Sequence, residues 1–281
     1  MTGDTGTIKV GTSGFSFPDW RGTIYPRGMS QKQELTYYQE ELGFDILEVN
    51  ASYYTLMDEK NVAVMGRKTK EGFEFIVKGY KGFTHDPFDD RLPEKPSIEK
   101  AMEDIAEFRK SLVPFMAKNK LGAVLLQFPV FFYPSKESED YIIKCKKSLA
   151  DIPLVIEFRN IEWSKGKIFD FLRENNLAYC AVDEPKLPRL MPFINEVTAD
   201  IGYIRMHGRN KNWFNAPTSV RYDYLYSDGE LNEFVPEAKK MADKAKKVYM
   251  LMNNCHAGKA VQNARRMKNL LGLPGKNNLL F

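Results

Sequence analysis

Residues 154–183 read LVIEFRNIEWSKGKIFDFLRENNLAYCAVD. The stretch begins and ends with short runs of apolar, β-branched and aromatic residues, Leu154–Arg159 and Ala178–Asp183, which are typical of strands. Between these two runs, Lys167–Asn175 has the apolar spacing of a helix. Strands that alternate with helices indicate neighbouring parallel strands of one sheet.

The same alternation extends from this stretch over the rest of the chain. Six more strands are predicted, at Ile8–Val10, Asp45–Asn50, Phe73–Lys78, Ala123–Phe128, Gly202–His207 and Val248–Asn253. Six more helices are predicted, at Gln31–Leu42, Asn61–Thr69, Ile98–Lys118, Ser138–Leu149, Asn232–Lys246 and Lys259–Leu271. The segment 185–200 has a weaker helical pattern. Eight such units predict an α/β fold, a TIM-type (β/α)8 barrel with eight parallel strands surrounded by helices.

The length and composition of the chain agree with one such barrel. The 281 residues contain no Ser/Gly-rich linker, so we expect a single domain over residues 1–281. The 41 basic and 37 acidic side chains give a net charge of +4, too small by itself to indicate nucleic acid. The first ten residues lack a signal-peptide pattern, and no apolar run is long enough to span a membrane. A cytoplasmic protein without membrane contact is expected, and no protein partner can be inferred.

Charged or polar residues lie inside several of the otherwise apolar strands. Side chains alternate between the two faces of a strand, so each of these residues lies opposite the apolar face that packs on helices. They are Glu48 and Asn50, Glu157 and Arg159, and Arg205 and His207. Other strands end in a polar residue, namely Lys78, Gln127, Asp183 and Asn253. Because barrel active sites lie at the C-terminal ends of the strands, we expect these side chains to converge at one mouth.

The types of these residues favour an anionic ligand. Arg205, His207 and Arg209 occupy every second position and would present three donors in line, and arginine binds phosphate or carboxylate with two N–H groups at once. Glu48, Glu157 and His207 are the candidates for proton transfer. The alternative is that the charges form an internal salt-bridge network, and the two interpretations are compatible.

Two long segments after strands, 79–97 and 208–229, are expected to carry function. The second should lie over the barrel mouth and bring Trp213 or Phe214 toward it. Aromatic residues in such loops can stack on a ligand or pack on the barrel. The predicted substrate-binding residues are Ser13, Trp20, Asn50, Lys78, His85, Gln127, Arg159, Asp183, Arg205, Arg209, Trp213 and Asn253.

Metal and thiol chemistry have weaker support. Glu48, Glu157, Asp183 and His207 could assemble a divalent-metal site, but no ligand spacing of a known metal motif accompanies them, so no metal ligand is predicted and the cofactor is left open. The three cysteines are far apart in the sequence and indicate neither a disulfide framework nor a zinc site. Cys255 is interpreted as a small buried apolar residue rather than a nucleophile.

Several of these motifs together resemble the YecE-like family, also known as domain of unknown function 72. The matching segments, in chain order, are Gly11–Phe15 with Pro18–Gly22, Glu48–Tyr54, Lys78 with Phe83–His85, Leu126–Pro129, Glu157–Asn160 with Trp163, Arg205–Arg209, and Asn253–Asn254 with Asn263–Ala264. The family usually has Trp where Phe15 stands here. The resemblance implies a TIM-type barrel with a polar mouth and does not imply a reaction.

These observations predict an enzyme that acts on a phosphate-bearing or otherwise anionic substrate, such as a nucleotide, a nucleic acid or a sugar phosphate. Lys78, Arg159, Arg205 and Arg209 would hold the anion, and phosphoester hydrolysis is the favoured reaction. Isomerisation or lysis of a sugar derivative is the second reaction class. The alternative function is a non-catalytic barrel that binds an anion or single-stranded nucleic acid.

Overall fold

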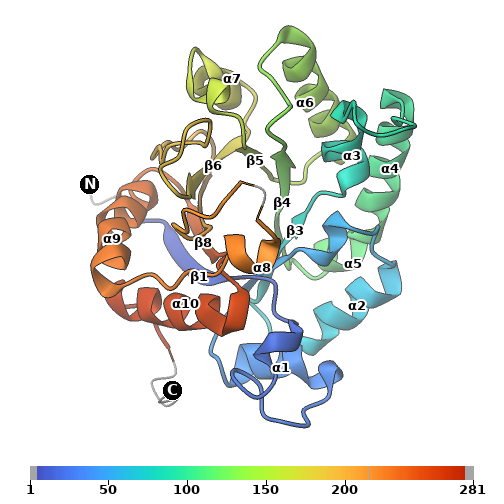
Figure 1. Cartoon of the computed structure of the whole chain (residues 1–281). Helices are drawn as coiled ribbons and strands as arrows, with labels where there is room; N and C mark the ends of the chain where they lie inside the picture. Colours follow the sequence, from blue (N-terminus) through green and yellow to red (C-terminus); the bar gives the residue numbers. More distant parts are fainter. Residues whose placement is uncertain (1–4, 215, 276–281) are drawn as a thin grey trace.

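Eight parallel strands close into a barrel in the order β1 to β8 in this computed structural model, which describes residues 5–214 and 216–275 (Figure 1). The strands are β1 (Thr7–Ser13), β2 (Ile46–Val49), β3 (Glu74–Lys78), β4 (Leu121–Phe128), β5 (Leu154–Phe158), β6 (Ala178–Asp183), β7 (Ile201–Met206) and β8 (Lys247–Met252). Each of the eight predicted strands is found within a few residues of its expected position. The predicted TIM-type (β/α)8 barrel is confirmed.

The barrel closes because β1 pairs with β8 over six residues, from Thr7 with Lys247 to Thr12 with Met252. Helices cover the outside of the strands and side chains fill the inside, so every residue of β6 and β7 is buried. Parallel strands that are buried on both faces require nearly continuous apolar sequence. A charged residue inside such a strand, such as Arg205, must therefore find its partners within the barrel.

The main helices form the outer ring. They are α1 (Gln31–Glu40), α2 (Glu59–Lys68), α4 (Ile98–Ser111), α6 (Lys136–Leu149), α7 (Ile168–Glu174), α9 (Asp228–Ala242) and α10 (Lys259–Leu270). Five of them begin after a Ser or Asp whose side chain accepts a hydrogen bond from the first turn: Ser30, Asp58, Ser97, Ser135 and Ser227. None of the helices within residues 5–214 and 216–275 is long and apolar enough to cross a lipid bilayer.

Two helical predictions need correction. The single helix expected at Ile98–Lys118 is divided into α4 and the short α5 (Val113–Met116), because Pro114 has no N–H to donate and its ring crowds the preceding turn. The weak pattern at 185–200 forms no helix. The expectation of a single domain over 1–281 includes residues 1–4, 215 and 276–281, which lie outside the described residues, and it stays a prediction.

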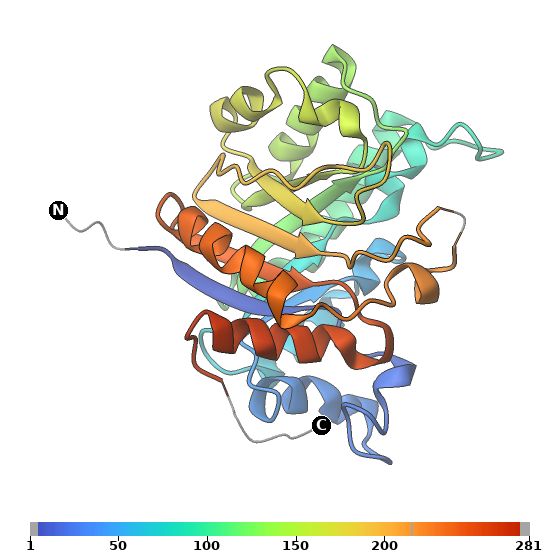
Figure 2. The same cartoon turned by 60° about the vertical axis from the view of Figure 1, so that its left-hand side comes forward.

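The two long loops lie at the end of the barrel toward which the strands point. Figure 2 shows the orange segment after β7, with the short α8 (Thr218–Arg221), beyond the arrowheads of the strands. The segment after β3 contains α3 (Lys81–Thr84). Five short 3-10 turns complete the described part of the chain: η1 (Pro18–Trp20), η2 (Ala51–Tyr53), η3 (Asp86–Phe88), η4 (Ile161–Ser164) and η5 (His256–Gly258).

Candidate functional site

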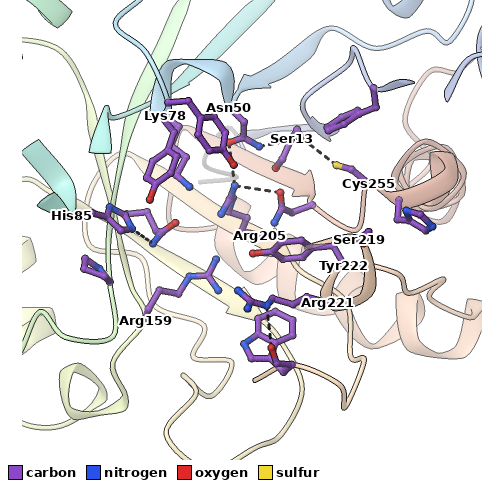
Figure 3. Close-up of a pocket in the computed structure, with 18 of the residues that line it drawn as sticks. Ser13, Asn50, Lys78, His85, Arg159, Arg205, Ser219, Arg221, Tyr222 and Cys255 are labelled. Atoms are coloured by element: carbon purple, nitrogen blue, oxygen red, sulfur yellow. Dashed lines mark hydrogen bonds between the residues drawn. The ribbon is translucent and has the colours of Figure 1, made fainter. Parts of the chain in front are cut away.

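A cavity of about 600 Å³ opens at the C-terminal ends of the strands. This volume lies in the range of small-molecule sites. In the described part of the chain, every strand except β6 contributes a lining residue from one of its last two positions or from the residue immediately after it. Figure 3 shows Lys78, Arg159 and Arg205 around the same space. The predicted position of the site, at the strand ends, therefore coincides with a cavity of suitable size.

The predicted site residues divide into two groups. Nine of them line the cavity: Ser13, Asn50, Lys78, His85, Gln127, Arg159, Arg205, Trp213 and Asn253. Six are not among the lining residues: Trp20, Glu48, Glu157, Asp183, His207 and Arg209. The five charged residues expected to meet in one cavity, Glu48, Glu157, Arg159, Arg205 and His207, do form one network, but only the two arginines reach the cavity. The roles assigned to all fifteen residues stay predictions.

Arg205 is the centre of this network. Its side chain is buried inside the barrel, and Glu48 accepts from its Nε at 3.0 Å and from its Nη2 at 2.5 Å. Glu157 accepts from its Nη1 at 3.1 Å. The hydroxyl of Tyr203 donates to Glu48 at 2.7 Å. Two carboxylates thus compensate one buried guanidinium, which also fixes its orientation at the floor of the cavity.

Arg159 is held by a carboxylate that sequence analysis missed. Its Nη1 donates to Oε2 of Glu184 at 3.0 Å, and its Nε lies 2.5 Å from Oε1 of Glu157 in an ion pair. Glu184 also accepts from the backbone N–H of Met191 at 2.9 Å. Burial raises the pKa of Glu184 to about 7, although the charge of Arg159 opposes the rise. The available signal was an acidic residue directly after a strand, but alternation along the strand does not say where such a residue points.

His207 lies beneath the cavity, between Arg159 and Asn253. Its Nε2 is 3.0 Å from Nη2 of Arg159 and 3.3 Å from Oε1 of Glu157, and its Nδ1 is 2.8 Å from the amide nitrogen of Asn253. Burial, and after it the charge of Arg159, holds the pKa of His207 well below its ordinary value. The imidazole is therefore neutral near pH 7, and its contacts orient Arg159.

Asp183 and Arg209 face away from the cavity, contrary to expectation. Cys180 of β6 points into the barrel, where its Sγ is 3.9 Å from Glu157, so Asp183 three positions later faces the helices. The expected line of three donors is also wrong, because β7 ends at Met206 and Gly208, at φ +93°, turns the chain. Arg209 binds Asp183 at 3.0 Å and Glu233 at 2.8 Å instead.

Trp20 supports the cavity wall from behind. It is fully buried, its indole N–H donates to the carbonyl oxygen of Cys255 at 2.7 Å, and its ring packs 5.0 Å from that of Phe17. Phe17 and Cys255 line the cavity, whereas Trp20 does not. Cys255 is buried, as predicted, and burial raises the pKa of its thiol, which is therefore protonated.

The loop after β7 covers part of the cavity, as predicted. Trp213 is buried and lines the cavity, with its ring 6.4 Å from that of His207, whereas Phe214 is exposed and does not. Arg221 donates from its Nε to the carbonyl oxygen of Trp213 at 3.1 Å. Arg221 and Tyr222 also line the cavity, and apart from the length of the loop no sequence pattern indicated them.

Lys78 differs from the other cations of the site. It ends β3 and its Nζ lies 4.2 Å from the centre of the Tyr53 ring. Within the described residues its Nζ has neither a hydrogen bond nor an ion pair. Burial, and then the charge of Arg205, lowers its pKa from 10.5 to about 7. Neighbouring His85 contacts Gln127 at 3.2 Å, and burial followed by the charge of Lys78 lowers its pKa to about 3.

The residues considered as metal ligands do not come together. Asp183 lies on the outer face of β6, and Glu48 and Glu157 are bound to Arg205. In the ranges that the structure describes, no group of three or more His, Cys, Asp or Glu residues is arranged to hold a metal ion. The arginines that separate the carboxylates make this donor set unsuitable for a cation.

A closed parallel barrel with a polar cavity at the C-terminal ends of its strands defines the TIM-barrel class of proteins. Residues 9–279 match the family model described as "Protein of unknown function DUF72", and the chain belongs to this family. The resemblance found in the sequence motifs is therefore confirmed.

Relatives cover nearly the whole chain. The UPF0759 protein YunF of Bacillus subtilis (strain 168) is 31% identical over 283 residues, which is 95% of each chain. The structure of a DUF72 family protein of Thermotoga maritima is 37% identical, with a TM-score of 0.85, over 95% of this chain and 99% of that one. A DUF72 family protein of Enterococcus faecalis is 28% identical, with a TM-score of 0.82, over 96% and 97%. These names establish the family and assign no reaction.

Proposed function

We propose that this protein is an enzyme that binds an anionic small molecule, bearing a phosphate or a carboxylate, in the cavity at the barrel mouth. The observation that supports this most is the arrangement of charge. Arg159, Arg205 and Arg221 line the cavity, whereas Asp19 is the single carboxylate among its described lining residues. The carboxylates that compensate the two buried arginines lie beneath them.

Arg159 retains hydrogen-bonding capacity for a ligand. Its Nη1 and Nη2 atoms carry two N–H groups each, and in the described chain each atom has one partner, Glu184 and His207 respectively. A guanidinium with two remaining N–H groups at the edge of a cavity can bind a phosphate or carboxylate in a bidentate manner. The fixed orientation of the side chain reduces the entropy lost on binding.

Aromatic side chains define the rest of the ligand space. Tyr53, Trp213, Tyr222 and Phe17 line the cavity together with the cations. Small-molecule sites combine such apolar walls with a few placed polar groups. The ligand is therefore expected to carry an apolar or planar part beside its anionic group.

The three residues predicted to transfer protons are not placed to support phosphoester hydrolysis. Hydrolysis requires a group that activates water within reach of the substrate. Glu48 and Glu157 accept hydrogen bonds from Arg205 and do not line the cavity, and His207 is buried beneath it. We therefore place substrate binding on the arginines and do not assign a hydrolytic base.

Calorimetric titration tests the proposal with inorganic phosphate, pyruvate, a nucleoside monophosphate and a hexose phosphate as probes. We expect at least one probe to bind, and Arg159→Gln to weaken that binding about 10- to 100-fold, because a charge-assisted hydrogen bond contributes roughly 1.5–3 kcal/mol. Arg209→Gln is the matched control, because Arg209 also pairs with a buried carboxylate but lies outside the cavity.

Three results would contradict the proposal. One is the absence of binding for every probe, and another is an equal loss of binding in the two variants. The third is a single-stranded oligonucleotide that binds in place of the small anions with log affinity falling steeply with log salt, which would support the non-catalytic nucleic-acid barrel instead.

A further inference from the structure

The amine of Lys78 differs from those of Lys120 and Lys268, which are buried. Nζ of Lys120 donates to the carbonyl oxygen of Gly66 and to the hydroxyl of Thr69, both at 2.9 Å. Nζ of Lys268 donates to the carbonyl oxygen of Gly43 at 2.7 Å. Lys78 has no such acceptor within the described residues and faces a cavity. Lys78 is half-buried, and an amine without protein acceptors at the wall of a cavity has its nitrogen available to a ligand.

The surroundings of Lys78 favour the neutral amine. Arg205 and Arg159 lie around the same cavity, and their positive charges disfavour a third cation there, whereas Glu157 and Glu48 act in the opposite direction from below. The Tyr53 ring covers one side of the amine. Desolvation and neighbouring cations are the means by which proteins convert lysine into a nucleophile, because only the neutral amine has a lone pair.

We propose that Lys78 forms a Schiff base with a carbonyl group of the anionic ligand. The inference rests on the proposed function, since the arginines must hold the anionic group for the carbonyl to reach Nζ. The ligand class is an aldehyde or ketone that carries a phosphate or carboxylate, such as a 2-oxo acid or an open-chain sugar phosphate.

The reaction balances without an external oxidant or reductant. The lone pair of Nζ attacks the carbonyl carbon, a C–N bond forms, and the carbonyl oxygen takes up a proton to become a hydroxyl group. The C–O bond then breaks and the oxygen leaves as water, whose two hydrogens balance the two protons that the amine loses. A C=N bond remains. A proton from solvent on the nitrogen gives the iminium, which withdraws electrons from the neighbouring carbon.

Reductive trapping tests the inference on the full chain. The probe is pyridoxal 5′-phosphate, which combines an aldehyde with a phosphate, and borohydride reduces any imine to a stable secondary amine. Peptide mass spectrometry then locates the label. At neutral pH the neutral fraction of an amine with a pKa near 7 is larger than that of an ordinary lysine by roughly a hundredfold or more. Lys78 is therefore expected to be labelled well before Lys81, its matched control, which pairs with Asp86 outside the cavity.

Variants make the result specific. Lys78→Met should lose the fast labelling, whereas Lys81→Met should keep it. Label distributed over lysines according to their exposure would overturn the inference. Pyridoxine 5′-phosphate, which lacks the aldehyde, separates this inference from the proposed function: if it binds by calorimetry while Lys78 remains unlabelled by the aldehyde, only the Schiff base is refuted. If neither compound binds nor labels, both proposals fail for this ligand class.

Discussion

The two ends of the barrel differ in how completely their charged side chains are paired. At the N-terminal end of the strands, Glu74 pairs with Lys9 at 2.9 Å and with Lys247 at 2.5 Å. There too, Lys120 donates to backbone and hydroxyl oxygens of Gly66 and Thr69. At the C-terminal end, Lys78 has no acceptor in the described chain and Arg159 uses one N–H group of each Nη atom. The cations named here are fully paired at the N-terminal end, whereas Lys78 and Arg159 keep unused N–H groups at the C-terminal end.

This difference separates a structural role from a functional one. Buried polar groups in a folded protein are normally satisfied, and an exception requires an explanation. In a TIM barrel the C-terminal end is where ligands bind and the N-terminal end is where polar residues stabilise the fold. The incomplete groups at the mouth agree with the proposed anion site, and the inner pairs of Arg205 hold that guanidinium in position.

The largest effect is expected from Glu157→Gln, which removes the carboxylate shared by Arg159 and Arg205. Breaking a buried ion pair leaves uncompensated charge, so the free energy of unfolding should fall by about 3–5 kcal/mol. Denaturant titration followed by circular dichroism measures this loss. Glu162→Gln is the control, because Glu162 pairs with Lys165 on the surface, and it should cost less than about 1 kcal/mol. Equal costs would mean that the inner network does not stabilise the fold.

The second prediction compares the two lysines directly. Lys120→Met leaves the oxygens of Gly66 and Thr69 without their donor, and it should lower the free energy of unfolding by roughly 1–3 kcal/mol. Lys78→Met removes an amine that burial disfavours and should raise the free energy of unfolding near pH 7 by roughly 1–3 kcal/mol, after allowance for solvent in the cavity. Thermal and denaturant unfolding of both variants measures the signs. If both variants lowered the free energy of unfolding, the two lysines would not differ and the contrast between the two ends of the barrel would be wrong.

The fold was predictable because strand and helix periodicity is a local property. Each of the eight strands was located from its own residues. The predicted helix at 98–118 is divided at Pro114, because the prediction gave more weight to the apolar spacing than to the proline. Arg205 and Glu48 were also found to share a network because alternation holds inside a strand.

The errors occur where a strand ends. Asp183 was placed in the mouth by its position at the end of β6, although its face could be read from Cys180. Arg209 and Glu184 lie beyond the last paired residues, where turns such as that at Gly208 determine direction. The cavity itself could not be predicted, because which of the converging side chains reach it depends on packing over distances that no sequence pattern records.

The smallest expected effect is a pH dependence. It concerns the difference in free energy of unfolding between Lys78→Met and the unsubstituted protein. Folding lowers the pKa of Lys78 from 10.5 to about 7, through burial first and then Arg205. Between these pH values the unfolded chain binds more protons at this residue than the folded chain, so its contribution to stability rises with pH. The Met variant lacks that contribution. The free energy of unfolding of the Met variant should exceed that of the unsubstituted protein most at and below about pH 7. This difference should narrow as the pH approaches 10.5.

Unfolding of both proteins by denaturant at about pH 6 and about pH 9.5 measures this narrowing, which cannot exceed the gain of Lys78→Met itself. The difference between the two proteins cancels the titration of groups that do not interact with Lys78. His85 does interact with it, but titrates below neutral pH, so the narrowing above about pH 7 reports on Lys78. The free energy of unfolding of Lys81→Met should change with pH in the same way as that of the unsubstituted protein, because the Lys81 amine lies outside the cavity. A gap that stays constant with pH would show that Lys78 keeps its proton in the folded state. The amine would then lack the lone pair that a nucleophile needs, and the open end of the barrel would hold one more fixed cation.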